Sequence, residues 1–170
     1  MFPKQYNLRR WQTGDEATLA KYANNYQVWR CVRDSFPHPY TLQHADEWIQ
    51  LCQTEVIPTV FAIEYGGEAV GGIGVIQQKD IYRKNAEIGY WLGQPFWGSG
   101  MMTEVVKEMS QYAFETFDIQ HLYAGVFEYN IGSMRVLEKA GFRAVSVQKK
   151  WLLKENQLWD EHLFLRERPA

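Results

Sequence analysis

The segment Trp97-Gly98-Ser99-Gly100-Met101-Met102-Thr103 has residue types that could bind an anion through the main chain. It precedes a long stretch of helical periodicity, and the start of a helix presents unpaired N–H groups with a partial positive charge. Gly98 and Gly100 remove side chains where a phosphate must approach the backbone, and they permit dihedrals that aim several N–H groups inward. Ser99 or Thr103 could add a hydroxyl contact. The alternative is a tight strand-to-helix turn that binds nothing.

Other phosphate-binding loops fit this segment less well. The P-loop ends in Gly-Lys-Ser/Thr, and the segment contains no lysine. The dinucleotide fingerprint needs a third glycine where Thr103 stands, and a Rossmann fold normally opens with that loop rather than carrying it past mid-chain. A nucleotide-dependent oxidoreductase is therefore the less favoured alternative.

The part of the chain before this segment is predicted to form strands and two helices. A strand is expected near residues 6–11, and a helix from about Asp15 that includes Tyr26. Thr41 is expected to cap a second helix. The buried stripe expected for that helix is Leu42, Ala45, Trp48, Ile49 and Cys52. Residues 59–65 and 69–77 read as two strands joined by the hairpin signal Gly66-Gly67-Glu68, and residues 86–92 as a strand that leads into the loop.

The rest of the chain is predicted to alternate helices and strands. The expected elements are a helix over 101–117, a strand over 121–127, a helix over 132–140 closed by Gly141, and strands over 142–153 and 158–166. Together these predict a mixed α/β sheet with helices packed on its faces.

Composition limits the classes of function. The length of 170 residues suits a single domain over 1–170, and a net charge of −2 without a basic stripe argues against a nucleic-acid partner. No apolar run reaches the ~18 residues that cross a bilayer, and no signal peptide is evident, so no membrane partner and a cytoplasmic location are expected. The cysteines and histidines show no metal-ligand spacing, which predicts no metal.

Three blocks of the chain resemble one known family. Gln94 to Glu104, with Tyr90-Trp91-Leu92 before it, resembles the acetyl-CoA signature of the GNAT superfamily of N-acetyltransferases. Asn130 to Phe142 is similar to the block Asn-x-x-Ser-x-x-Val-Leu-Glu-Lys-x-Gly-Phe of the branch that contains the ribosomal-protein N-terminal (alanine/serine) acetyltransferases. Phe36 to Thr41, with Ala45, resembles that branch's N-terminal motif. The similarity covers nearly the whole chain.

This resemblance implies a fold and a cofactor site. The fold is α/β (α+β): a mixed, mostly antiparallel sheet of about six or seven strands with about four flanking helices, in which two splayed parallel strands, 87–92 and 122–127, form the acetyl-CoA cleft. The loop from Trp97 to Thr103 would hold the pyrophosphate. The other residues implied to contact acetyl-CoA are Tyr90, Trp91, Leu92, Asn130, Ser133 and Arg135. Asn130 is expected to bond either the pantetheine or the neighbouring backbone.

The resemblance also implies direct attack of an amine on the thioester, which needs a base and a proton donor. Strand alternation places Glu87 on the face of Gly89 and Trp91, so Glu87 is the candidate base; a structural or exposed carboxylate is the alternative. Ser133 is the candidate acid, with helix N-capping as its rival role.

A departure from the family pattern concerns the acid. Many relatives have a tyrosine where Leu137 stands, so Ser133, Tyr129 or solvent must donate the proton. His38 and Tyr40 are candidates for the acceptor mouth, or for packing alone.

The partners implied are acetyl-CoA and a primary amine, either a protein N-terminus or a small molecule, and a homodimer is left open. The alternative function is a non-catalytic acyl-CoA-binding or sensing module of the same fold.

Overall fold

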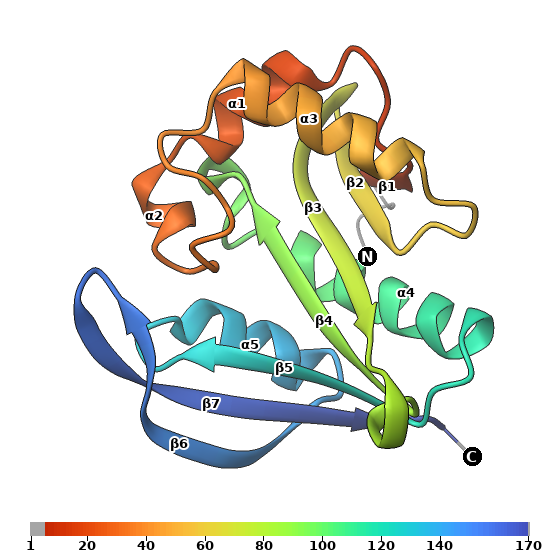
Figure 1. The fold of residues 1–170 in the computed structure, drawn as a ribbon, viewed down its shortest axis with the longest axis vertical. Coiled ribbons are helices and arrows are strands. Elements are labelled where there is room, and N and C mark those ends of the chain that lie inside the picture. Colours follow the sequence, from red (N-terminus) through yellow and green to blue (C-terminus); the bar gives the residue numbers. More distant parts are fainter. Residues whose placement is uncertain (1–5, 170) are drawn as a thin grey trace. The chain divides into compact units, whose positions relative to one another are not determined.

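The computed structural model describes residues 6–169, and its chain divides into two compact units (Figure 1). The first unit comprises the chain up to Gly74 together with Tyr90–Met101, and the second comprises Val75–Gly89 together with the chain from Met102 onward. Each unit is described by itself below.

The first unit contains three helices and the beginning of the sheet. Its helices are α1 (Glu16–Ala23), α2 (Tyr26–Trp29) and α3 (Leu42–Gln53), and its strands are β1 (Tyr6–Arg9), β2 (Val60–Tyr65) and the first part of β3 (Glu68–Gln77). The end of β4 (Asn85–Leu92) and the 3-10 turn η2 (Gln94–Phe96) complete it. The pairs β1–β2 and β2–β3 are antiparallel, and the hairpin at Gly66-Gly67 is confirmed because both glycines have positive φ.

The second unit contains the remaining strands and the longest helix. Its elements are the end of β3, the 3-10 turn η1 (Asp80–Tyr82), the start of β4, α4 (Met101–Thr116), β5 (His121–Phe127), α5 (Ile131–Lys139), β6 (Arg143–Lys154) and β7 (Gln157–Glu167). β4 pairs with β5 in parallel, whereas β5–β7 and β6–β7 are antiparallel.

The order of the strands confirms the expected fold class. It is β1-β2-β3-β4-β5-β7-β6 in a mixed, mostly antiparallel sheet of seven strands. Two details of the predicted helices were wrong: the length of the first helix, and part of the buried stripe of the second. The helix from Asp15 does not extend to Tyr26, because it ends at Ala23 and Asn25 caps the separate helix α2 through a hydrogen bond from the Gln27 amide.

The N-cap of α3 is confirmed and its predicted stripe is partly wrong. The Thr41 hydroxyl accepts the His44 amide, while the His44 ring accepts the Thr41 amide, which makes a capping box. Ala45 and Ile49 are buried, but Leu42 is 60% exposed. In the first turn the capping geometry rather than hydrophobic contact fixes the helix, so Leu42 can face solvent.

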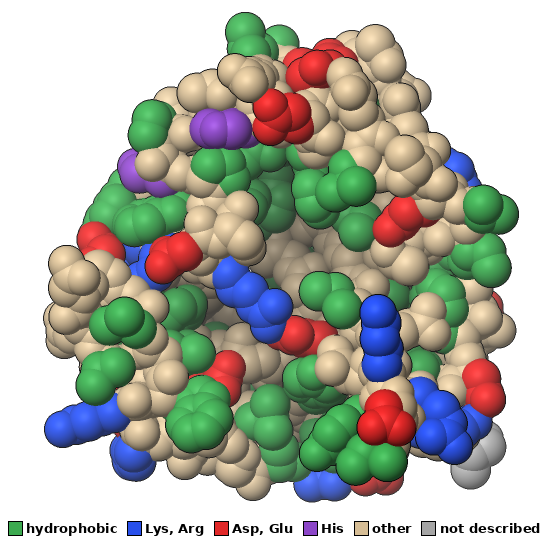
Figure 2. Space-filling view, viewed as in Figure 1, with side chains coloured by type: hydrophobic (Ala, Val, Ile, Leu, Met, Phe, Trp, Pro, Cys, Tyr) green, Lys and Arg blue, Asp and Glu red, His purple; other side chains and the backbone are tan. Residues whose placement is uncertain are grey.

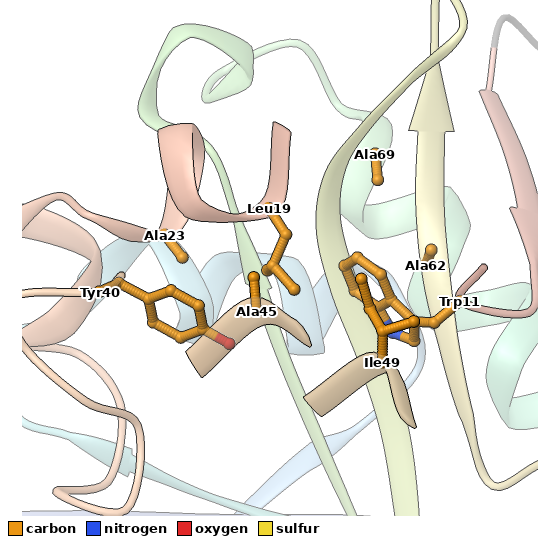
Figure 3. Close-up of a cluster of buried hydrophobic side chains, with 8 residues drawn as sticks. All are labelled: Trp11, Leu19, Ala23, Tyr40, Ala45, Ile49, Ala62 and Ala69. Atoms are coloured by element: carbon orange, nitrogen blue, oxygen red, sulfur yellow. The ribbon is translucent and has the colours of Figure 1, made fainter. Parts of the chain in front are cut away.

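The core of the first unit lies where α1 and α3 meet the strands. Figure 3 shows the cluster of buried side chains: Trp11, Leu19, Ala23, Tyr40, Ala45, Ile49, Ala62 and Ala69. The strand glycines make room for the indoles of this core, because a Cβ added to Gly72 would lie 2.9 Å from Nε1 of Trp91 and 3.2 Å from the Trp11 ring.

The core of the second unit lies on one face of its strands. One face of α4 is buried, with Met102, Val105, Val106, Met109 and Ala113, and Phe117 just beyond the helix is buried as well. β5 alternates, with Leu122, Ala124 and Val126 buried and the residues between them more exposed. In Figure 1, α4 and α5 lie behind the strands of this unit. The face that carries Tyr123, Gly125 and Phe127 is therefore the one that these helices leave open.

The hairpin of β6 and β7 exposes several apolar side chains. Trp151, Leu153 and Leu158 are more than half exposed, and Figure 2 shows hydrophobic side chains at the surface over this hairpin. Between Gln148 and Leu152 the strand bulges, and the Asp160 carboxylate accepts both the Lys150 amide and the Lys149 ammonium. Within residues 6–169 no helix is long and apolar enough to cross a bilayer.

Candidate acetyl-CoA and acceptor site

The glycine loop is braced by its own main chain before α4 begins. The Phe96 amide donates to the Gly93 carbonyl at 3.0 Å, and the Trp97 amide donates to the Gln94 carbonyl at 3.1 Å. The Trp97 indole N–H donates to the Leu92 carbonyl at 2.7 Å. Both N–H groups of Trp97 therefore already have acceptors, so this residue positions the loop, and the amides that follow it are the ones open to an anion.

Three consecutive amides beyond Trp97 face no protein acceptor. Within the described chain, the N–H groups of Gly98, Ser99 and Gly100 donate no hydrogen bond to protein, and all three residues are exposed. Gly98 has φ of 74° and Gly100 has φ of 81°, a region that L side chains rarely adopt. A Cβ at either position would meet nothing within 4 Å, so the glycines serve the backbone conformation. Successive amides of this kind form a concave anion site.

The hydroxyl of Ser99 belongs to this brace. It donates to the Phe96 carbonyl at 2.7 Å and accepts the Met101 amide at 3.3 Å, which are local side-chain to backbone bonds. Its proton is therefore already committed within the loop. Of the two hydroxyls expected to contact a phosphate, Thr103 is the better candidate by elimination, although it is 91% buried in the first turn of α4.

The N-terminus of α4 adds the partial positive charge of a helix start to that of these amides. The helix has 16 residues, so its first turn carries the full partial charge expected of a helix N-terminus. Glu104 in that turn is acidic, but Lys107 pairs with it at 2.8 Å and offsets its charge. The loop and the helix start together fit a diphosphate.

A set of contacts that sequence reasoning missed holds the loop from the side of α1. The ring of Phe96 packs edge-on against Tyr22 at 5.3 Å and lies 5.6 Å from the ring of Tyr65. The Asn25 amide group donates to the Gln94 side chain at 2.8 Å. These residues lie tens of positions apart in the sequence, so no local pattern could have revealed them.

Glu87 and Tyr123 are paired residues on neighbouring parallel strands. The β4–β5 ladder contains three residue pairs and ends at Glu87 and Tyr123. Because paired residues in a sheet point to the same face, these two side chains lie together on the face opposite the buried Ala86 and Ile88. The predicted parallel strands are confirmed, and the short ladder agrees with their expected separation. Tyr123 was missed, because the register of two parallel strands is not visible in the sequence.

Asn130 is the N-cap residue of α5. Its side-chain Oδ1 accepts the Ser133 amide at 3.2 Å, and the helix begins at Ile131. Asn130 therefore bonds the neighbouring backbone, one of its two expected roles. Ser133 lies three residues inside and is not the N-cap, which removes the rival role proposed for it. Arg135, two residues further on, is exposed.

Leu137 and Tyr129 are placed very differently. Leu137 is fully buried, so this position on α5 faces the core of its unit. The ring of Tyr129 stacks on Phe127 at 5.1 Å and meets Trp159 edge-on at 4.8 Å. A tyrosine therefore lies at the start of α5 even though the helix itself offers none.

The remaining candidates lie in the first unit. Leu92 is buried, and Trp91 is partly buried with its ring edge-on to Phe36 at 5.6 Å. Tyr40 is 7% exposed, and burial raises the pKa of its phenol to about 12, so it is a core residue. His38 is exposed and stacks on Trp29 at 5.2 Å.

Comparison with known proteins identifies the family. The model of the acetyltransferase (GNAT) domain matches residues 6–143, which is most of the chain. The chain therefore belongs to the GNAT acetyltransferase family.

Individual relatives carry names in keeping with this family. A probable N-acetyltransferase, YjcK, of Bacillus subtilis (strain 168) is 41% identical over 55% of this chain, and the match spans only 52% of that relative. The N-acetyltransferase p20 of Bacillus licheniformis is 23% identical over 96% of this chain and 93% of its own. Mycobacterium smegmatis RimJ, solved in complex with CoA-disulfide, matches with a TM-score of 0.82 and 20% identity over 95% of this chain and 81% of that one. At that identity the structural match supports the fold.

Proposed function

We propose that the protein is an acetyl-CoA-dependent N-acetyltransferase that acetylates a primary amine, either a protein N-terminus or a small molecule, by direct attack in a ternary complex. The observation that carries the proposal is the run of three unpaired, exposed amides from Gly98 to Gly100, two of them on positive-φ glycines, just before a 16-residue helix. A diphosphate matches such a site in charge and shape without needing lysines. Membership of the acetyltransferase family supports coenzyme A as the source of that diphosphate.

The reaction needs no covalent enzyme intermediate. The lone pair of a neutral amine forms the N–C bond at the thioester carbonyl, the C–S bond breaks, the amine loses a proton, and the thiolate of coenzyme A gains one. A thioester is already activated, so most of the acceleration comes from positioning the two reactants. The protein must supply a proton acceptor, a donor to the carbonyl oxygen and a proton donor to the thiolate.

These roles fall to residues on two elements, β4 and α5. Tyr90, Trp91 and Leu92 are proposed to pair with the pantetheine arm through their main chain and to donate an N–H to the thioester carbonyl. Glu87 accepts the amine proton, directly or through water. Ser133 supplies the proton or hydrogen bond to the thiolate, since the capping work at the start of α5 is done by Asn130.

Asn130 and Arg135 are proposed to complete the contacts to coenzyme A. Oδ1 of Asn130 is occupied by the Ser133 amide, which leaves its Nδ2 as the group that can donate to the pantetheine. Arg135 is exposed two residues beyond Ser133, and its cation would border the nucleotide phosphates.

A turnover assay tests the proposal. Release of free coenzyme A thiol is followed with acetyl-CoA and a panel of peptides, diamines and monoamines. At least one amine should accelerate thiol release, and mass spectrometry should find that amine acetylated. Acetyl-CoA binding without acetylation of any amine would instead indicate a non-catalytic acyl-CoA-binding module.

A further inference from the structure

A glycine in the middle of β5 is unexplained by the backbone. Gly125 does not have a positive φ, so any residue could adopt its conformation. Glycine weakens a strand interior, because it loses more conformational freedom on folding and offers no side chain for packing. The residue therefore has another reason to be a glycine.

The side chain of Glu161 on the neighbouring strand β7 occupies the space that a side chain at residue 125 would take. A Cβ added to Gly125 would overlap the Glu161 carboxylate and would lie 2.8 Å from its Cδ. Glu161 is paired with Phe127 in the β5–β7 ladder, so its side chain leans along β5 into the space above Gly125. The missing side chain of Gly125 thus lets a carboxylate lie directly over β5.

This carboxylate shares a face with Glu87 and Tyr123. Tyr123, Gly125 and Phe127 alternate with buried residues, and Glu161 faces the same way as its partner Phe127. In Figure 1 the helices of this unit lie behind its strands, so these helices do not cover this face. Two residues of strand separate Gly125 from the Glu87–Tyr123 pair, which is about 7 Å.

We infer that Glu161 binds a positively charged group of an acceptor whose reacting amine lies at Glu87, two strand residues or about 7 Å along β5. The inference rests on the proposed function, and the substrate class is a primary amine that also carries a second, positively charged group. A carboxylate pairs with an ammonium or guanidinium through charge-assisted hydrogen bonds. The spacing matches the two ends of an extended five-carbon diamine, and it also suits a peptide N-terminus followed by a lysine or arginine side chain.

Steady-state kinetics with matched acceptors test the inference. One arm compares 1,5-diaminopentane with pentylamine, and the other compares peptides that begin Ala-Lys and Ala-Ala. The wild type should favour the doubly cationic member in at least one arm, and that arm identifies the source of the cation. In Glu161→Gln the KM of the favoured acceptor should rise about tenfold or more, with kcat within about twofold, because the lost contact stabilises the bound substrate and the transition state equally.

Two further variants separate binding from folding. Gly125→Ala keeps the carboxylate but displaces it, and it should reproduce the loss of preference. Glu167→Gln removes the same charge from the same strand, where Glu167 is exposed and paired with Arg143 at 2.9 Å, and it should retain the wild-type preference.

The outcomes distinguish this inference from the proposed function. An unchanged preference in both Glu161→Gln and Gly125→Ala, with turnover intact, would overturn the role of Glu161 and leave the acetyltransferase standing. A wild type that acetylates the singly charged acceptors equally well would also overturn it. A wild type that acetylates no amine would remove the proposed function, and this inference with it.

Discussion

Glu87 and Tyr123 form the last residue pair of the parallel β4–β5 ladder, and their side chains share the face opposite the buried Ala86 and Ile88. A carboxylate and a phenol are thus adjacent at the point where the two strands stop pairing. The pair is the part of the proposed site best fixed by the sheet.

Replacing Glu87 with glutamine should lower kcat by about 10²-fold or more, because the variant keeps the shape of the side chain but cannot accept a proton. The KM for acetyl-CoA should change little. The measurement is the initial rate of thiol release with a saturating amine. Glu115→Gln, which alters an exposed residue of α4, is the control and should turn over like the wild type. A Glu87→Gln enzyme of normal rate would demote Glu87 to a structural residue.

Tyr123→Phe and Glu87→Gln should not be additive. Because the two side chains are neighbours on one rung, the double variant should lose less activity than the product of the single losses. Coupling energies of about 0.5–3 kcal/mol are usual for residues in contact. The check is a double-mutant cycle on kcat/KM. Strict additivity would show that the two residues act independently despite their pairing.

Gly98→Ala and Gly100→Ala should weaken acetyl-CoA binding. At φ of 74° and 81° an alanine is strained by about 1–2 kcal/mol per residue, and relief of that strain turns the amides away from the anion. The KM for acetyl-CoA should rise about tenfold. Gly66→Ala, at φ of 60° in the β2–β3 hairpin, carries similar strain far along the chain and should lower only the melting temperature. Equal effects of all three substitutions on the KM for acetyl-CoA would argue against this loop as the binding site of acetyl-CoA.

The stability of the first unit should depend strongly on Arg9. Its guanidinium donates to both oxygens of Asp15, at 2.7 and 2.8 Å, and also pairs with Glu64, and these hydrogen bonds raise the pKa of Arg9. Because the Asp15 side chain is only 7% exposed, Arg9→Met leaves its carboxylate buried without a cationic partner. We expect a loss of about 3 kcal/mol in the free energy of unfolding, measured in urea. Arg143→Met, which breaks an exposed pair, should cost less than about 1 kcal/mol.

Cys52 should make the protein less stable in alkali. Burial raises the pKa of its thiol from 9.0 to about 12, and nearby Glu55 adds to the effect. In the unfolded chain the thiol ionises near pH 9, while in the folded chain it stays protonated. Its contribution to stability is therefore complete below pH 9 and is lost as the pH rises toward 12. Cys52→Ala should show a shallower fall in unfolding free energy between pH 9 and pH 11 than the wild type; equal slopes would contradict the assignment.

Much of the fold was predictable because local signals were strong. The period of α4, the Gly66-Gly67 turn and the capping box at Thr41 each specify an element without help from distant residues. The break between α1 and α2 was not predictable, because Leu19, Tyr22, Ala23 and Tyr26 keep helical spacing across it. The Asn25 cap takes precedence there, and its side chain also reaches Gln94 far along the chain.

The candidate site was predictable in its loop and less so in its sheet. The unusual backbone conformation at Gly98 and Gly100 can be predicted because glycine favours it. The hydrogen bonds by which Trp97 and Ser99 hold the loop depend on the fold and could not be predicted. Tyr123 and Glu161 were missed because strand register places them beside Glu87 and over Gly125. A glycine within an alternating strand was the only signal of that arrangement.

The most direct test is a crystal structure of the protein with coenzyme A. The pyrophosphate oxygens should lie about 2.7–3.2 Å from the amide nitrogens of Gly98, Ser99 or Gly100. A diphosphate bound at any other part of the chain would contradict the account at its centre.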